Sequence, residues 1–487
     1  MSLSSRLPSL SRARKDALIA QLLGRVDALT RQVEDLTARM QDLESENAVL
    51  RAENATLRAE NATLREKLTL PPKTPNNSSL PPSRGQKANE EPGRKPKAKA
   101  HAGAHRPLHP NPTRTRDVLV EECPHCRADV SGVAQTAVHV YDRIEIPEIK
   151  PDVTQVRLQG GTCPCCAKRF TAGAPAGLEP GSPFGPNLRA FAIYLRYTQA
   201  ISFERLSGLM SDLLGVAISE GALVNILADS RSAFACQAER IQERLRSSTI
   251  LQSDETSVRV GKRTWWTWVF HHDRDCCFAI RPSRGRDVVA DFLGEHRPDI
   301  WVSDRFAAQM GWATRAHQVC LAHLIRDAQR AIEAGDAAFA PGLKKLLQRA
   351  CGMGARRPDL ADATLRSYAS KLNARLDDLL RRAPTHALGE KLQRAIKACR
   401  QNLFVFLADR AVPPTNNGSE QGLRPCVTFR KCLPRTRSGV TNGFRSEWGA
   451  KLYADVRSVL ETARRRAISA LDAIRLTLTG SALPAGP

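Results

Sequence analysis

The first seventy residues carry apolar side chains at a strict seven-residue spacing. Leucine stands at every seventh position from Leu22 to Leu64, and a second series, three residues earlier, runs from Ile19 to Asn61. This is the a/d pattern of a left-handed coiled coil, with leucine at d. The last three a positions are asparagines, which favour a parallel, in-register dimer because another register would bury the amides without partners. We expect residues 1–70 to form a homodimeric coiled coil; the alternative is one amphipathic helix packed on its own chain.

Residues 71–116 follow with no hydrophobic periodicity. The segment is rich in proline, polar residues, lysine and arginine, so it cannot bury a core, and we expect a disordered basic linker. It either contacts DNA phosphates or is only a solvated tether. A coiled coil next to basic residues is also typical of basic-zipper regulators. In that architecture, however, the basic helix precedes the zipper, and here the basic stretch follows it.

Residues 117–175 contain two C-x-x-C motifs that flank alternating apolar and polar residues. The alternation in VHVYDRIEIPEI and DVTQVRLQGGT predicts two paired strands. Such a hairpin would bring the motifs together, and each motif can present two thiolates to one metal, which predicts a closed, structural zinc site. The expected Zn²⁺ ligands are Cys123, Cys126, Cys163 and Cys166, with His125 and Cys165 as further donors nearby.

Residues 176–246 predict helices, and the residues after them predict a sheet. GVAIS separates two helical segments, which suits either a DNA-binding helix-turn-helix or an ordinary helical hairpin. From residue 247, TILQSDETSVRV, RTWWTWVFHH and CCFAIRPS predict three successive strands. A helix at DVVADFLGE and strands at DIWVSD and HQVCLAHLI follow. This order favours a mixed sheet covered by helices, within a multidomain α/β protein.

The overall charge narrows the class of partner. Among 487 residues, 73 are basic and 50 are acidic, so the formal net charge is +23. Such an excess attracts polyanions, so nucleic acid is the expected partner and an anionic membrane surface the alternative. The sequence has no run of eighteen apolar residues and no visible secretion signal, and its thirteen cysteines favour reduced thiols and metal ligands. We expect a cytoplasmic, nucleoid-associated protein that does not span a membrane.

Three carboxylates stand where chemistry is expected. Asp254 lies inside an apolar strand, where a carboxylate is costly unless it is paired, hydrogen-bonded or metal-bound, and Asp304 ends a later strand. Glu420 lies in PPTNNGSEQGLRP, where prolines followed by Asn416 or Asn417 as a cap predict a helix start. Each carboxylate alone has an ordinary structural explanation. Together they predict oxygen ligands for two Mg²⁺ or Mn²⁺ ions, a site that suits in-line displacement at phosphorus.

These features together resemble a DDE transposase of the insertion sequence 66 family, along nearly the whole chain. The matching segments, in order, are the coiled coil, PNNSSLPPS, the cysteine motifs, SDET with TWWTWV, WVSD, CLAH, NNGSEQGLR and a C-terminal helix. The resemblance implies that Asp254, Asp304 and Glu420 form the catalytic triad. It also implies an RNase H-like catalytic domain, and the expected boundaries are 247–454 for this domain, about 327–407 for a helical insertion in it, and 455–487 for a C-terminal helix and tail.

The implied activity is metal-dependent DNA cleavage and strand transfer at the ends of an insertion sequence. Cys320 and His323 resemble the Cys-x-x-His signature of related transposases, whereas Arg305 and Gln421 depart from the residues common in the family. The alternatives are a catalytically inactive DNA-binding regulator derived from a transposase and a nuclease that does not join ends. Accessory proteins are further implied partners. Basic residues after Glu420 are expected either to contact phosphates or to form a solvated face: Arg424, Arg430, Lys431, Arg435, Arg437 and Arg445.

Overall fold

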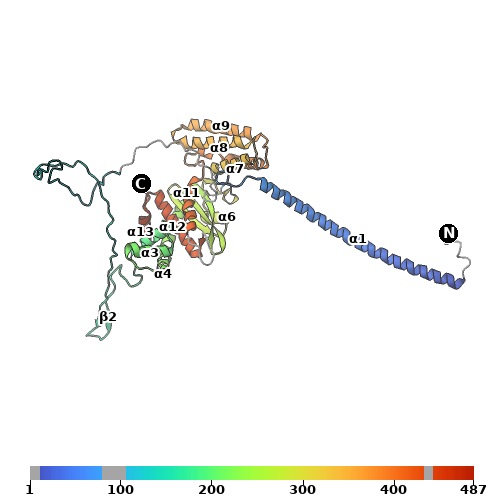
Figure 1. Ribbon diagram of the computed structural model, residues 1–487, viewed down its shortest axis with the longest axis horizontal. Helices are drawn as coiled ribbons and strands as arrows, with labels where there is room; N and C mark the ends of the chain where they lie inside the picture. Colours follow the sequence, from blue (N-terminus) through green and yellow to red (C-terminus); the bar gives the residue numbers. More distant parts are fainter. Residues whose placement is uncertain (1–10, 79–105, 433–442, 487) are drawn as a thin grey trace. The chain divides into compact units, whose positions relative to one another are not determined.

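A long helix forms the first of two units. The computed structural model describes residues 11–78, 106–432 and 443–486, and the chain divides into units at residue 73. Helix α1 (Arg12–Thr69) has 58 residues (Figure 1), or about 87 Å at 1.5 Å per residue. Its predicted seam is uncovered in this single chain, with Leu22 at 52% and Leu36 at 62% exposure. An isolated helix gains little without packing of an apolar face, so the dimer remains our prediction.

The centre of the second unit is a mixed sheet. Its strand order is β5-β4-β3-β6-β7; β3, β4 and β5 pair antiparallel, whereas β6 and β7 run parallel to β3. The three strands predicted first are confirmed, as is the strand at DIWVSD. A short strand, β8 (Gly443–Phe444), also pairs with β3. The bounds are β3 Ile250–Val260, β4 Arg263–His272, β5 Asp275–Arg281, β6 Ile300–Ser303 and β7 Ala316–Val319.

A helix closes the outer edge of this sheet at β5. Helix α12 (Glu447–Arg465) packs along the strand, and two of its hydroxyls, one turn apart, take the place of a neighbouring strand. The Cys276 N–H donates to Thr462 Oγ1 at 3.1 Å, and the Phe278 N–H donates to Ser458 Oγ at 2.8 Å. An uncovered edge strand would offer unpaired backbone groups to other chains. The boundary expected at residue 455 therefore falls inside a helix that belongs to the sheet.

Six helices, from segments before, within and after the sheet, pack with it into one apolar core. They are α2 (Pro186–Tyr197), α3 (Phe203–Leu214), α4 (Glu220–Asp229), α5 (Arg231–Arg246), α6 (Arg286–Leu293) and α13 (Ala470–Leu478). The α3–α4 pair lies where a helix-turn-helix or helical hairpin was expected. Helix α4 carries Glu220 and Asp229 and has no lysine or arginine. That charge favours the hairpin, because phosphate contacts need basic side chains.

Four further helices form a second apolar cluster, between β7 and the helix that carries Glu420. They are α7 (Leu321–Glu333), α8 (Ala340–Arg356), α9 (Asp362–Leu380) and α10 (Ala387–Ala398), and α8 lies beside both α7 and α9 (Figure 1). The strand predicted at HQVCLAHLI ends at Val319, so that prediction was wrong for its second half. From Leu321 the buried residues recur at helical spacing, and Cys320 occupies the position that caps α7.

The two cysteine motifs lie in turns with little regular structure between them. A short hairpin of β1 (Gly160–Thr162) and β2 (Arg169–Thr171) flanks the second motif, and a single bridge between Glu122 and Asp129 flanks the first. Residues 131–159 contain no strand. The predicted pairing of VHVYDRIEIPEI with DVTQVRLQGGT is therefore not found. Many of the apolar side chains there, such as Val138 and Ile146, are exposed, so alternation in this segment did not reflect a buried face.

Part of the expected linker is ordered. Residues 74–78 form a turn in which the Thr74 N–H donates to Asn77 Oδ1 at 2.7 Å. Asn77 is buried and donates through Nδ2 to Glu333 at the end of α7.

Helices in the described ranges are all too short or too polar to cross a membrane.

Candidate active site

Asp254 and Asp304 lie near each other, on segments that the parallel pairing of β3 with β6 brings together. This pairing sets Ile250 opposite Ile300 and Gln252 opposite Val302. Asp254 lies two residues further along β3, and Asp304 directly follows the end of β6 at Ser303. The negative charge of Asp304 is one of the causes that raise the pKa of Asp254, as expected for neighbouring carboxylates. The Phe306 N–H donates to Asp304 Oδ1 at 2.9 Å and holds that carboxylate at the strand end.

Glu420 lies on α11 (Asn417–Cys432), a helix in contact with β3 and β4. Burial raises the pKa of Asp254 well above its ordinary value, and the negative charges of Glu255, Asp304 and Glu420 raise it further. Asp254 accepts one hydrogen bond, from the Glu255 N–H at 2.9 Å. The fold thus places the three predicted carboxylates in one neighbourhood of high negative charge.

The carboxylate of Glu420 is engaged by α7. Arg326 donates through Nη2 to Glu420 Oε1 at 2.8 Å, and His323 Nε2 lies 3.8 Å from the same oxygen. Burial and the charge of Arg326 lower the pKa of His323. We expected a site role for His323 but overlooked Arg326. The signal was present, because residues three apart on a helix lie on one face.

A second ion pair ties α7 to the end of β6. Arg305, which directly follows Asp304, donates to Asp327 Oδ2 at 2.6 Å. Arg305 was expected to depart from the residue common in the family, and the structure gives it Asp327 as a partner. Cys320 is buried at the start of α7, and its sulfur accepts a hydrogen bond from the Asn416 N–H at 3.1 Å. Burial raises the pKa of the Cys320 thiol to about 11, so this thiol is structural in character.

A chain of buried hydrogen bonds fixes where α11 begins. The Asn416 carbonyl accepts from the backbone N–H groups of Ser419 and Glu420 at 3.1 and 3.2 Å, so Asn416, and not Asn417, is the cap. Its side chain is fully buried: Nδ2 donates to the Ser253 carbonyl at 2.6 Å, and Oδ1 accepts from Ser419 Oγ at 2.6 Å. Because Ser253 precedes Asp254, one side chain connects the backbone beside Asp254 to the helix turn that carries Glu420.

The same chain continues to His271 on β4. Arg465 Nη1 lies 3.2 Å from His271 Nδ1, and His271 Nε2 lies 3.0 Å from Ser419 Oγ. Arginine can only donate, so Nδ1 is the acceptor and Nε2 carries the proton toward Ser419. Burial and the charge of Arg465 lower the pKa of His271, which keeps the ring neutral. Gly418 is required here, because a Cβ atom would lie 2.9 Å from the His271 ring.

A polar cluster supports Asp254 from the neighbouring position. The Glu255 side chain is 1% exposed, pairs with Arg284 at 2.7 Å and accepts from Gln309. The Arg284 guanidinium lies over the rings of Trp266 and Phe306, at 4.5 and 4.0 Å from their centroids. Because Phe306 is two residues beyond Asp304, this arginine connects the segments that follow both aspartates.

The donor set suits a hard divalent cation, but its present geometry does not hold one. Carboxylate oxygens in a region of negative charge are the ligands that Mg²⁺ and Mn²⁺ prefer. Among the described residues, no three histidine, cysteine, aspartate or glutamate side chains converge closely enough to hold a metal ion. At the carboxylates, Glu420 is instead bound to Arg326.

The predicted phosphate contacts are only partly within the described residues. Arg424 and Arg445 are exposed, and Arg430 donates to the Ser257 carbonyl on β3. Arg435 and Arg437 lie outside the described residues, as does the side chain of Lys431.

The two C-x-x-C motifs have matching local geometry. In each, the first cysteine accepts at its carbonyl from the residue after the second cysteine, Arg127 at 2.8 Å and Ala167 at 2.9 Å. Both of those residues have positive φ, 62° and 57°. Backbone hydrogen bonds from the second cysteine and its predecessor lower the pKa of Cys123 and Cys163, which favours thiolates. Each turn suits half of a zinc site, although the described residues do not bring Cys123, Cys126, Cys163 and Cys166 together.

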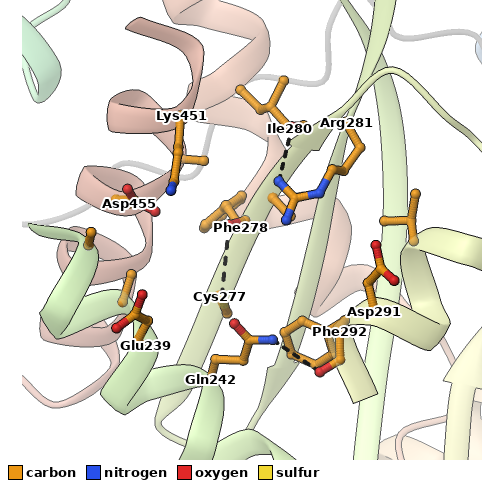
Figure 2. Close-up of a pocket in the computed structure, with 15 residues that line it drawn as sticks. Glu239, Gln242, Cys277, Phe278, Ile280, Arg281, Asp291, Phe292, Lys451 and Asp455 are labelled. Carbon is orange, nitrogen blue, oxygen red and sulfur yellow. Dashed lines mark hydrogen bonds between the residues drawn. The ribbon is translucent and has the colours of Figure 1, made fainter. Parts of the chain in front are cut away.

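A separate cavity lies at the β5 edge of the sheet, between α5, α6 and α12. Figure 2 shows it, with Glu239, Lys451 and Asp455 among its lining residues. Its volume is about 160 Å³. None of the described residues that line it was predicted as a site residue, so this cavity is distinct from the carboxylate cluster.

Comparison with known proteins identifies the class of protein. The fold is mixed α/β, with a carboxylate cluster on a mixed sheet. A family model described as "Transposase IS66 family" matches residues 181–449, which is more than half of the chain. The chain therefore belongs to the IS66 family of transposases. The matched segment includes the three carboxylates. It begins after the coiled coil and the cysteine motifs, which it does not cover. A search of curated proteins finds no match.

Proposed function

We propose that this protein is a DDE-type transposase that cleaves DNA at the ends of an insertion sequence and joins those ends to a target. The main support is the parallel pairing of β3 with β6, which brings the segments of Asp254 and Asp304 together, and the negative charges of Asp304 and Glu420, which act on Asp254. The catalytic domain is an RNase H-like core in this proposal. Its support is the sheet, three antiparallel strands followed by two parallel ones in the order β5-β4-β3-β6-β7.

Asp254, Asp304 and Glu420 are the residues that hold Mg²⁺ or Mn²⁺ in this proposal. Such ions, when bound, activate a hydroxyl nucleophile and stabilise the leaving oxygen at a phosphodiester. The chain's own residues do the positioning. The Asn416 network sets the start of α11, and the Glu255–Arg284 pair supports the segment beside Asp254. Arg424 and Arg445 are exposed near this helix and hold phosphates of the DNA.

The remaining parts supply assembly and DNA binding. The exposed a/d seam of α1 supports a homodimer, and its asparagines at 47, 54 and 61 bond their own helix in the single chain. Those amides are free to exchange these contacts for partners across a parallel seam. The matched cysteine turns support a structural Zn²⁺ site. The net charge of +23 supports DNA as the partner.

Strand transfer in vitro tests this proposal. Full-length protein is incubated with labelled element-end DNA, a target plasmid and Mg²⁺ or Mn²⁺, and joined products are counted. Asp254→Asn, Asp304→Asn and Glu420→Gln keep the side-chain shape and remove the charge, and each is expected to abolish cleavage and joining. Asp291→Asn, an exposed aspartate on α6, is the matched control and should leave both intact. Joining that survives in the three triad variants would refute the site.

The two rival functions give different outcomes in the same assay. Cleaved ends without joined products, in the wild type, would identify a nuclease that does not join. Specific DNA binding with neither cleavage nor joining would identify an inactive regulator.

A further inference from the structure

We propose that Arg326 is an exchangeable counter-ion for Glu420: it binds this carboxylate in the metal-free protein and competes with a divalent cation for it. This inference rests on the proposed function, since it concerns the metal that the triad would hold. It adds a residue, Arg326, whose removal should tighten metal binding. A residue that only supports the site would have the opposite effect.

The contact is strong enough to compete. Arg326 Nη2 lies 2.8 Å from Glu420 Oε1, with the two side chains only 21% and 30% exposed. A charge-assisted hydrogen bond that is partly shielded from solvent is among the stronger polar contacts in proteins. His323 Nε2 lies 3.8 Å from the same oxygen, beyond hydrogen-bond distance. Glu420 Oε1 is therefore directed toward α7, and a cation that binds Glu420 must compete with the positive charge of Arg326.

Release of Arg326 does not require α7 to move. The adjacent residue, Asp327, is bound separately to Arg305 at 2.6 Å, which fixes α7 to the end of β6. Arg326 Nε also donates to the Ala322 carbonyl of its own helix at 3.3 Å, and this bond can hold the guanidinium near α7 after Glu420 leaves. The exchange in this proposal involves the side chains of Arg326 and Glu420 and leaves α7 in place. Arg326 then remains beside the site as an unpaired cation, where a DNA phosphate is its natural partner.

Direct binding of Mn²⁺ to the full-length protein without DNA tests the exchange. Mn²⁺ affinity is measured by titration calorimetry or by the electron paramagnetic resonance signal of free Mn²⁺. Arg326→Gln is expected to bind Mn²⁺ roughly tenfold more tightly than wild type, the size expected for the loss of one charge-assisted competitor. Arg330→Gln is the matched control, because it removes the same charge from the same helix. Among the described residues Arg330 has no hydrogen bond or ion pair with the three carboxylates, so this variant should change the affinity by less than about twofold.

A double variant separates competition from general electrostatics. With Glu420→Gln in the background, Arg326→Gln should give no gain, because the competing contact no longer exists. Equal affinities for wild type and Arg326→Gln, weaker binding by Arg326→Gln, or an equal gain in Arg330→Gln would each overturn the inference. Arg326→Lys keeps the charge with a less suitable donor and should fall between wild type and Arg326→Gln.

Failure of the proposed function would look different. If Asp254→Asn and Asp304→Asn bind Mn²⁺ as wild type does, the triad is not the metal site and both proposals fall. If those variants lose binding while Arg326→Gln shows no gain, the triad stands and only the exchange is refuted. Circular dichroism of each variant shows whether the fold is intact, and Arg326→Lys carries the test if Arg326→Gln does not fold.

Discussion

Asn416 is the residue through which the start of α11 is fixed, and replacing one atom of it tests that role. Asn416→Asp keeps the shape of the side chain but replaces the Nδ2 donor by an oxygen. That atom donates to the Ser253 carbonyl at 2.6 Å in a fully buried position. In the variant, a carboxylate oxygen therefore faces the Ser253 carbonyl oxygen, and neither can donate. The variant also adds a buried negative charge near Asp254 and Glu420.

The expected loss of stability follows from these contacts. A buried acceptor left without its donor costs about 1–3 kcal/mol, and a charge buried beside other carboxylates adds to this. An acid at a helix N-terminus recovers about 0.3–1 kcal/mol through the helix dipole. We expect Asn416→Asp to lower the free energy of unfolding by about 3 kcal/mol. Asn417→Asp, at the exposed neighbouring position, should stay within about 0.5 kcal/mol of wild type.

Tryptophan fluorescence during urea unfolding measures the relevant unit. The six tryptophans all lie after residue 264, so the signal reports the second unit and not the coiled coil. The Asn416→Asp deficit should shrink in acid, because a protonated carboxyl can again donate to Ser253. Equal loss in the Asn416 and Asn417 variants, or no loss in either, would refute the assignment of Asn416 as the buried cap.

Three further predictions concern other parts of the chain. Glu461 on α12 is 3% exposed and pairs with Arg457, Arg464 and Arg465. Glu461→Gln should therefore destabilise the second unit by roughly 3 kcal/mol in the same assay. Glu447→Gln, at an exposed position of the same helix, should not. Burial raises the pKa of Asp455 from 3.8 to about 6, so the folded state binds the carboxyl proton more tightly than the unfolded state. The contribution of this proton to the free energy of unfolding is full below about pH 4 and is lost as the pH rises through 6. Asp455→Asn should therefore match wild type near pH 4 and be more stable above pH 7, by at most about 3 kcal/mol, and a constant difference across this range would contradict the reasoning. Purified protein should contain one zinc per chain by elemental analysis; Cys123→Ser or Cys163→Ser should lose it and Cys165→Ser should keep it, and a zinc-free wild type would count against the site.

The sequence alone determined the elements whose signals are local. Short runs of apolar, β-branched and aromatic residues, bounded by turn signals, placed β3, β4 and β5 within a residue or two, because such runs are typical of strands. The prolines and asparagines before Glu420 located the start of α11 for the same reason, because capping depends on neighbouring residues. The second half of the strand predicted at HQVCLAHLI was wrong because a short apolar run suits a strand and a buried helix equally well.

Only the tertiary structure decided which distant polar groups meet. The choice of Asn416 over Asn417 depends on the Ser253 carbonyl, more than 150 residues away, and the partner of Glu420 is Arg326 on a helix of the insertion. Ser458 and Thr462 accept hydrogen bonds from backbone N–H groups of β5, and nothing in the sequence around them indicates these contacts. Periodicity is a property of neighbouring residues, and it says which face of an element is buried. A buried polar group must instead be matched to a particular partner, and which partner is within reach depends on how the elements pack in three dimensions.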